Sequence, residues 1–386
     1  MVHDLALRAR TPLALGATSV LALALGALWL LEPSSSPYED TDGAVSLLSL
    51  LPDVVAPVLV LLGGVLGLAT SVALATASRS PVGRRGLIAA AATVALVLSV
   101  FCMDSQLIAF IGYFCAMTIP VIAVVLLVAA LRRSMAARAT ALVATGLVTW
   151  WGIGSGSFAP DTIGELVRTL GEGYARVGFR PWILLGLAAL TVQWMSASLA
   201  WAAPYTARLQ QPSTRLDRIT TIATVVAAVC PLPYVLLRST WLFPDALFTG
   251  PLTPADLDPA MRLWGLLLGA AALGGSILTV GLLRPWGRVF PAWMPSLRGR
   301  TVPVAAAAVP GYAVAFVLTA TAPSIVLLSI EQAADGDTAA LWMLGVLPFW
   351  AWGPALAVAV WGYVRSRRAA GAQTTRPTRE TGKMAA

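Results

Sequence analysis

Apolar residues run along nearly the whole chain in long blocks separated by short polar connections. A helix that spans a bilayer needs roughly 20 mostly apolar residues, because the hydrocarbon core is about 30 Å thick and a helix rises about 1.5 Å per residue. Ten blocks meet this requirement, so we predict an all-α, polytopic bundle of about ten transmembrane helices. They lie near residues 12–31, 53–77, 86–103, 107–131, 139–157, 182–203, 218–237, 263–283, 302–330 and 339–364.

The composition agrees with this pattern, since 58% of the 386 residues are hydrophobic and only 11% are charged. Charged residues make up about a quarter of a soluble domain. No segment longer than a loop has the composition of a soluble domain. We therefore predict a single transmembrane domain over residues 1–368, followed by a disordered cytoplasmic tail over the polar residues 369–386.

Basic and acidic residues alternate between successive connections. A cytoplasmic N-terminus places 21 of the 26 basic residues, but only three of the 18 carboxylates, on the cytoplasmic side. This excess of arginine near the inner ends of spans predicts that both termini are cytoplasmic. It also predicts contact with anionic lipid at that face, without a nucleic-acid partner. A single lysine beside 25 arginines suggests a high-GC bacterial genome, and hence a bacterial plasma membrane.

Two spans contain a Thr-x-Pro step. Divided at the 158–181 loop, the ten spans form two sets of five with opposite directions, as in an inverted repeat. The fourth and ninth spans then correspond, and they contain Thr118-Ile119-Pro120 and Thr321-Ala322-Pro323. Proline frees backbone carbonyls that lipid cannot satisfy, so these residues are candidate substrate-binding positions. The alternative is that proline is simply common in membrane helices.

The deepest strongly polar side chain is Gln193, near the centre of the sixth span, with Ser196 one turn away. These two residues are further substrate-binding candidates, and the alternative for Gln193 is a hydrogen bond to a neighbouring helix. No acid lies in the middle of a predicted span, so an apolar or neutral substrate suits this lining best. The long ninth span must tilt, project from the membrane or break at Pro310-Gly311, and a break would favour a cavity.

Small residues recur at helix-packing spacing in Gly63-x-x-x-Gly67 and Gly265-x-x-x-Gly269, which predicts close approach of helices within the chain. Residues 162–177 form an amphipathic pattern typical of a helix on the outer membrane surface, with Glu165, Arg168, Glu172 and Arg176 on its polar face. That face is either a solvated, charge-paired surface or a lid over an outward cavity.

Carboxylates gather on the predicted outer face. Polyprenol-linked sugar transferases are polytopic proteins with acidic residues in their first outer loop. In this chain, the predicted first outer loop contains Glu39-Asp40-Thr41-Asp42. A carboxylate there could act as a base or a metal ligand, with outer arginines binding lipid phosphate. The candidates are Asp40, Asp42, Asp53 and Asp104. The only histidine is His3, and no zinc, phosphate-loop or nucleophile-elbow motif occurs, so we predict no cofactor and no metal.

One cytoplasmic connection has the pattern Trp286-Gly287-x-x-Phe290-Pro291-x-Trp293-x-Pro295. It resembles a segment of uncharacterised multi-spanning membrane proteins of high-GC Gram-positive bacteria. The resemblance covers about a dozen residues and the following span, and it implies no activity.

The sequence is compatible with three functions. The first is a permease-like transporter of an apolar or neutral small molecule, which the paired prolines and Gln193 favour. The second is a non-catalytic scaffold or partner subunit, in which small residues and interfacial aromatics serve assembly with a protein partner or another copy. The third is an outward-facing, polyprenol-linked glycosyltransferase acting through the outer carboxylates.

Overall fold

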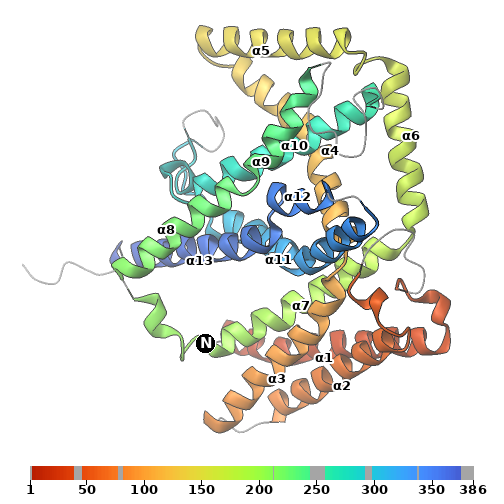
Figure 1. The fold of residues 1–386 in the computed structure, drawn as a ribbon. Helices are drawn as coiled ribbons and strands as arrows, with labels where there is room; N and C mark the ends of the chain where they lie inside the picture. The colour runs from red at the N-terminus through yellow and green to blue at the C-terminus, as the bar shows by residue number, and fades with distance from the viewer. Residues whose placement is uncertain are drawn as a thin grey trace, which may run out of the picture. The chain divides into compact units, whose positions relative to one another are not determined.

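The computed structural model of the protein describes residues 2–38, 46–76, 81–211, 213–243, 257–291, 298–336 and 339–374, and over these ranges the chain is helical with two isolated β-bridges (Figure 1). Nine helical segments of the described chain are long and apolar enough to cross a membrane. The protein is therefore an all-α, multi-pass membrane protein. The α-helices are α1 (Val2–Leu31), α2 (Val55–Thr76), α3 (Pro81–Ser99), α4 (Ser105–Leu131), α5 (Met135–Gly154), α6 (Pro160–Val177), α7 (Arg180–Ala202), α8 (Thr214–Val229), α9 (Leu232–Ser239), α10 (Pro259–Gly281), α11 (Val304–Ala334), α12 (Ala339–Val346) and α13 (Phe349–Thr374).

The fifth predicted span, near 139–157, is not among the nine. It coincides with α5, which is helical over 20 residues and begins at an N-cap where the backbone N–H of Ala137 bonds to Oγ of Ser134. Arg138 lies in its first turn, and a Trp-Trp pair with several glycines fills its second half. These residues reduce its hydropathy relative to the other spans. At the other end of the chain, α13 continues through Thr374, six residues into the predicted tail.

The chain folds into two compact units that are interleaved in sequence. Unit 1 contains residues 1–113, 167–209 and 320–341, and unit 2 contains residues 114–166, 210–319 and 342–386. The helices α4, α6, α11 and α12 each contribute residues to both units.

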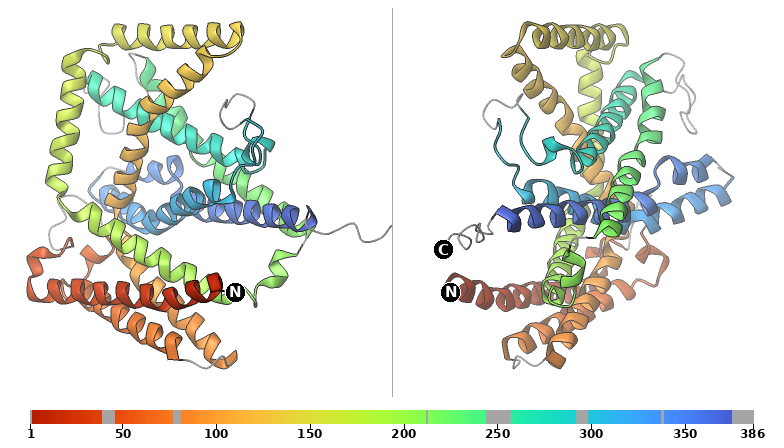
Figure 2. Two further views of the ribbon diagram at one scale, coloured as in Figure 1. Left: turned by 180° about the vertical axis from the view of Figure 1, so that it is seen from behind. Right: turned by 90° about the vertical axis from the view of Figure 1, so that its left-hand side faces the viewer.

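In unit 1, α1 packs along α2 and α3 packs along α7 (Figure 2). Glycines bring the first pair together: a Cβ on Gly64 would lie 2.8 Å from Cγ of Leu23 and 3.0 Å from its backbone nitrogen. A Cβ on Gly67 would lie 2.6 Å from Oγ of Ser19 in α1 and 3.0 Å from the ring of Trp194 in α7. The prediction that the Gly63–Gly67 motif serves close packing within the chain is thus confirmed.

In unit 2, α8 packs along α13, and α10 packs against α8 and α9. The C-terminal half of α13 makes side-chain contacts to distant segments. Arg365 forms an ion pair with Asp217 in the first turn of α8, and Arg367 donates hydrogen bonds to the backbone carbonyls of Arg288 and Val302. Tyr363 donates to the carbonyl of Gly287, so α13 holds the described part of the 284–303 connection.

Candidate functional site

The prolines named in the sequence analysis do not end their helices. α4 continues through Pro120, and α11 continues through both Pro310 and Pro323, so the break considered at Pro310-Gly311 is absent. In the span over Thr214–Leu242, by contrast, the ladder of helical hydrogen bonds is interrupted between α8 and α9, although Cys230 and Pro231 keep right-handed helical backbone angles. This interruption lies near the middle of the 29-residue span.

The break leaves backbone carbonyls without their helical donors. A helix carbonyl normally accepts from the N–H four residues later, and Pro231 and Pro233 have none to offer to Ala227 and Val229. Ala227 is fully buried. In a bilayer, an unsatisfied carbonyl costs several kcal/mol, so such groups are tolerated only where protein, water or a ligand reaches them.

A neighbouring helix satisfies one carbonyl at the break. Ser276 of α10, which is 6% exposed, donates from Oγ to the carbonyl of Ala228 at 2.5 Å. Most other buried hydroxyls on these helices bond within their own helix, as Thr224 does to the carbonyl of Thr220. The bond from Ser276 therefore ties α10 to the break. Together, Ser276 and the carbonyls of residues 227–229 form a group of neutral, hydrogen-bonding atoms that we call the α8–α9 break site.

The residues predicted to bind substrate are not gathered in one unit. Thr118 and Pro120 belong to unit 2, whereas Gln193, Ser196, Thr321 and Pro323 belong to unit 1. Gln193 is half-buried, and the exposed Ser196 donates to its backbone carbonyl at 2.8 Å. Thr118 donates to the carbonyl of Cys115 in its own helix.

Two hydroxyls beside Pro323 are completely buried, those of Thr321 and Ser324. Oγ of Ser324 has no hydrogen-bond partner in the described part of the chain. The Thr-x-Pro step of α11 is thus set in a buried environment, whereas Pro120 of α4 is exposed.

The segment between α1 and α2 folds over the end of α3, and we call its described residues, 32–38 and 46–54, the cap. Tyr38 donates from its hydroxyl to the carbonyl of Phe101 at 3.0 Å. The N–H of Leu47 and Oγ of Ser46 both bond to the carbonyl of Met103, at 3.0 and 3.3 Å. Burial, and to a lesser degree the nearby Asp104 carboxylate, raise the pKa of Tyr38 well above its usual value, so this hydroxyl remains a donor.

Asp104, a predicted outer-face acid, is buried in an ion pair under the cap. Its Oδ2 lies 2.6 Å from Nη2 of Arg180, and its Oδ1 accepts from the N–H of Gln106 at 2.8 Å. The side chains of Asp104 and Arg180 are 0% and 8% exposed. Asp104 is therefore committed to joining the start of α4 to the start of α7. The sequence placed both residues near span ends but offered no signal for their pairing.

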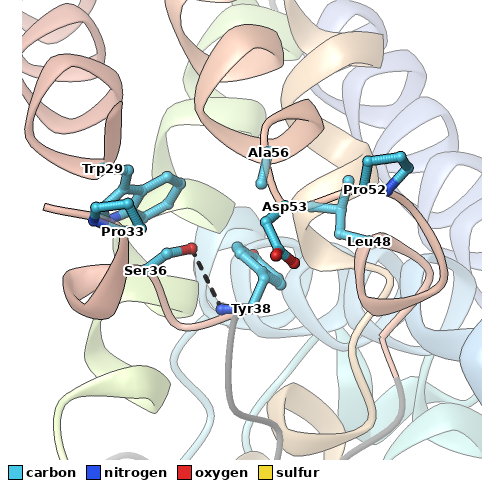
Figure 3. Close-up of a pocket in the computed structure, with 8 residues that line it drawn as sticks. All are labelled: Trp29, Pro33, Ser36, Tyr38, Leu48, Pro52, Asp53 and Ala56. Carbon is cyan, nitrogen blue, oxygen red and sulfur yellow. Dashed lines mark hydrogen bonds between the residues drawn. The ribbon is translucent and has the colours of Figure 1, made fainter. Parts of the chain in front are cut away.

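A small pocket opens in the cap, and Asp53 lines it (Figure 3). Its volume is about 20 Å³, enough for roughly one water molecule. The indole N–H of Trp29, which also lines the pocket, is buried and has no partner in the described chain. Asp53 is exposed, while Asp40 and Asp42 lie outside the described residues. The remaining lining residues are Pro33, Ser36, Tyr38, Leu48, Pro52 and Ala56.

The amphipathic segment is helical as predicted, in α6. On its polar face, Arg168 pairs with Glu172 at 3.3 Å. Both side chains are more than half exposed, which favours a solvated surface.

Comparisons with protein-family models, with curated proteins and with solved structures find no match to this chain.

Proposed function

We propose that the protein is a permease-like transporter of a neutral small molecule in a bacterial plasma membrane. The observation that carries this proposal is the interruption of the hydrogen-bond ladder of a membrane-spanning helix near its middle, at Cys230–Pro231. Interrupted spans expose backbone carbonyls at mid-membrane depth, and in transporters such carbonyls contribute to substrate sites.

The chemistry of the break site favours a neutral substrate. Its polar groups are the hydroxyl of Ser276 and the backbone carbonyls of residues 227–229, which accept hydrogen bonds without carrying charge. The charged residues of this span lie toward its ends. Asp217, in the first turn of α8, pairs with Arg365 of α13, and Arg238 follows the break by seven residues. A solute with hydroxyl or amide donors would pair with these carbonyls.

Transport is tested by uptake into proteoliposomes of purified full-length protein, with labelled polyols, sugars and neutral amino acids as solutes. Comparing the metabolites of a deletion strain with those of its parent selects the solutes to try first. The double variant Pro231→Ala/Pro233→Ala restores both missing N–H donors and should make the span continuous. We expect it to lose at least about tenfold in initial uptake rate while remaining as stable as the wild type or more so.

Ser276→Ala should also reduce uptake, because it leaves the Ala228 carbonyl without its partner. The matched control is Ser239→Ala, since that exposed hydroxyl bonds to Leu236 in its own helix. Uptake no greater than in empty liposomes for every solute, or full activity of the double proline variant, would refute the proposal.

We also propose that both termini are cytoplasmic, which requires α5 to cross the membrane as a tenth span. Single cysteines at Ser134 and Ser366, in a background lacking Cys102, Cys115 and Cys230, test this arrangement. Both should be labelled only from the cytoplasmic side by an impermeant maleimide. If α5 does not cross, residue 366 will be labelled from outside while residue 134 is not.

A further inference from the structure

Arg238, at the end of α9, lies against two aromatic rings. Its guanidinium carbon lies 3.9 Å from the ring centroid of Trp241 and 5.0 Å from that of Tyr234. Both distances are within the roughly 6 Å range of cation–π attraction. Trp241 and Tyr234 are buried, at 4% and 8% exposure, so the rings are themselves fixed by packing.

The glycines of α10 provide the space for this arrangement. A Cβ on Gly265 would collide with the ring of Trp241, and a Cβ on Gly269 would lie 2.8 Å from Cβ of Arg238. The Gly265-x-x-x-Gly269 motif, predicted to bring helices together, thus receives the side chains of Arg238 and Trp241. α10 therefore packs directly against the arginine side chain and limits its rotamers.

This fixed cation has no anionic partner among the described residues. Nε of Arg238 and the indole N–H of Trp241 are buried donors without acceptors there. The two Nη atoms of Arg238 are not buried in this way, so they are accessible to a ligand. Leaving a half-buried cation unpaired is costly, and an anion supplied from solution or from lipid would offset that cost.

A second arginine approaches the same tryptophan. Nη1 of Arg262 donates to the backbone carbonyls of Trp241 and Phe243, at 3.2 and 2.6 Å. The nearest carboxylate along α10 is Asp258, whose Oδ1 caps the helix by accepting from the N–H of Met261 at 2.7 Å. The described part of the cluster is therefore cationic, and we call Arg238, Trp241 and Arg262 the arginine–tryptophan cluster.

We propose that the arginine–tryptophan cluster is a binding site for a phosphate group. It lies where the span over Thr214–Leu242 ends and the span over Pro259–Gly281 begins, which is the depth of lipid headgroups. Planar guanidinium groups match the geometry of phosphate oxygens, and the indole N–H adds a neutral donor. Two sources share this chemistry, the headgroup of an anionic phospholipid and a soluble phosphate.

The test uses full-length protein in a maltoside detergent, which contains no phosphate. Dioleoyl phosphatidylglycerol and inorganic phosphate are titrated separately at constant ionic strength, and bound molecules are counted by native mass spectrometry. We expect Arg238→Gln to weaken binding about tenfold or more, and Trp241→Phe to weaken it less, because the ring remains. Arg176→Gln, which removes an exposed arginine from α6, is the matched control and should bind like the wild type.

The two ligands distinguish the sources. Phosphatidylglycerol binding that inorganic phosphate displaces indicates a lipid headgroup recognised through its phosphate, whereas binding of phosphate alone indicates a soluble ligand. In the wild type, a photoreactive phosphatidylglycerol should crosslink within residues 232–243 or 259–269, a readout that does not depend on any variant folding. Equal affinities of the Arg238 and Arg176 variants, crosslinks confined to other segments, or no binding of either ligand would each overturn the proposal. None of these outcomes depends on transport activity.

Discussion

Replacement of Asp104 by alanine is expected to reduce the free energy of unfolding by about 3–5 kcal/mol, because it removes the carboxylate that pairs with the buried Arg180 guanidinium. The pair is almost inaccessible, with 0% and 8% exposure, and Asp104 also accepts from the N–H of Gln106. The loss should be visible as a fall in melting temperature of purified protein in detergent, and as a smaller folded fraction after membrane extraction.

Two further variants show whether the ion pair itself is responsible. Glu172→Gln breaks the exposed pair with Arg168, so it should change stability by no more than about 1 kcal/mol. The double variant Asp104→Leu/Arg180→Met removes both charges and should recover much of the loss, because neither charge of this pair then remains buried. If the double variant is no more stable than Asp104→Ala, the loss arises from packing or capping.

Gly64→Ala is expected to destabilise the protein by about 1–3 kcal/mol, the usual range for an overpacked core. The added methyl group would lie 2.8 Å from Cγ of Leu23 and 3.0 Å from its backbone nitrogen. A flexible side chain can move aside, but the backbone of α1 cannot do so without separating the two helices. Urea or thermal unfolding of the purified protein measures this loss.

The control is Gly86→Ala, which makes the same chemical change in α3. A Cβ on Gly86 would have nothing within 4 Å, and the residue is exposed. Alanine favours a helix over glycine by up to about 1 kcal/mol, so this variant should be slightly stabilised. A similar change in stability for both variants would show that α1 and α2 are not in the close contact described.

The positions of most membrane helices could be predicted because each one depends only on the length and hydropathy of a local segment. α5 is the exception, since its apolar block is diluted by Arg138 and by glycine and tryptophan. The effect of a proline was harder to predict. Pro120 and Pro323 stand in uninterrupted helices, while Pro231 stands at a break.

Pairings between distant residues were not predictable from local patterns. Asp104 and Arg180 are 76 positions apart, and only the docking of α7 beside α3 brings them together. The glycines at 265 and 269 correctly indicated a close approach, but the groups that approach are side chains of α9 and the residues after it. The Pro231-x-Pro233 pattern was a usable local signal for the break site, because it removes two donors within one turn.

The contacts of α13 determine when the protein can complete its structure during synthesis. Because α13 packs along α8, and Arg365 and Arg367 bond to residues near positions 217, 288 and 302, unit 2 stays incomplete until almost the whole chain has been translated. Unit 1 must also wait, since it includes residues 320–341. The early helices therefore enter the membrane well before their final neighbours exist. A chain whose synthesis stops after α10 would have neither unit finished.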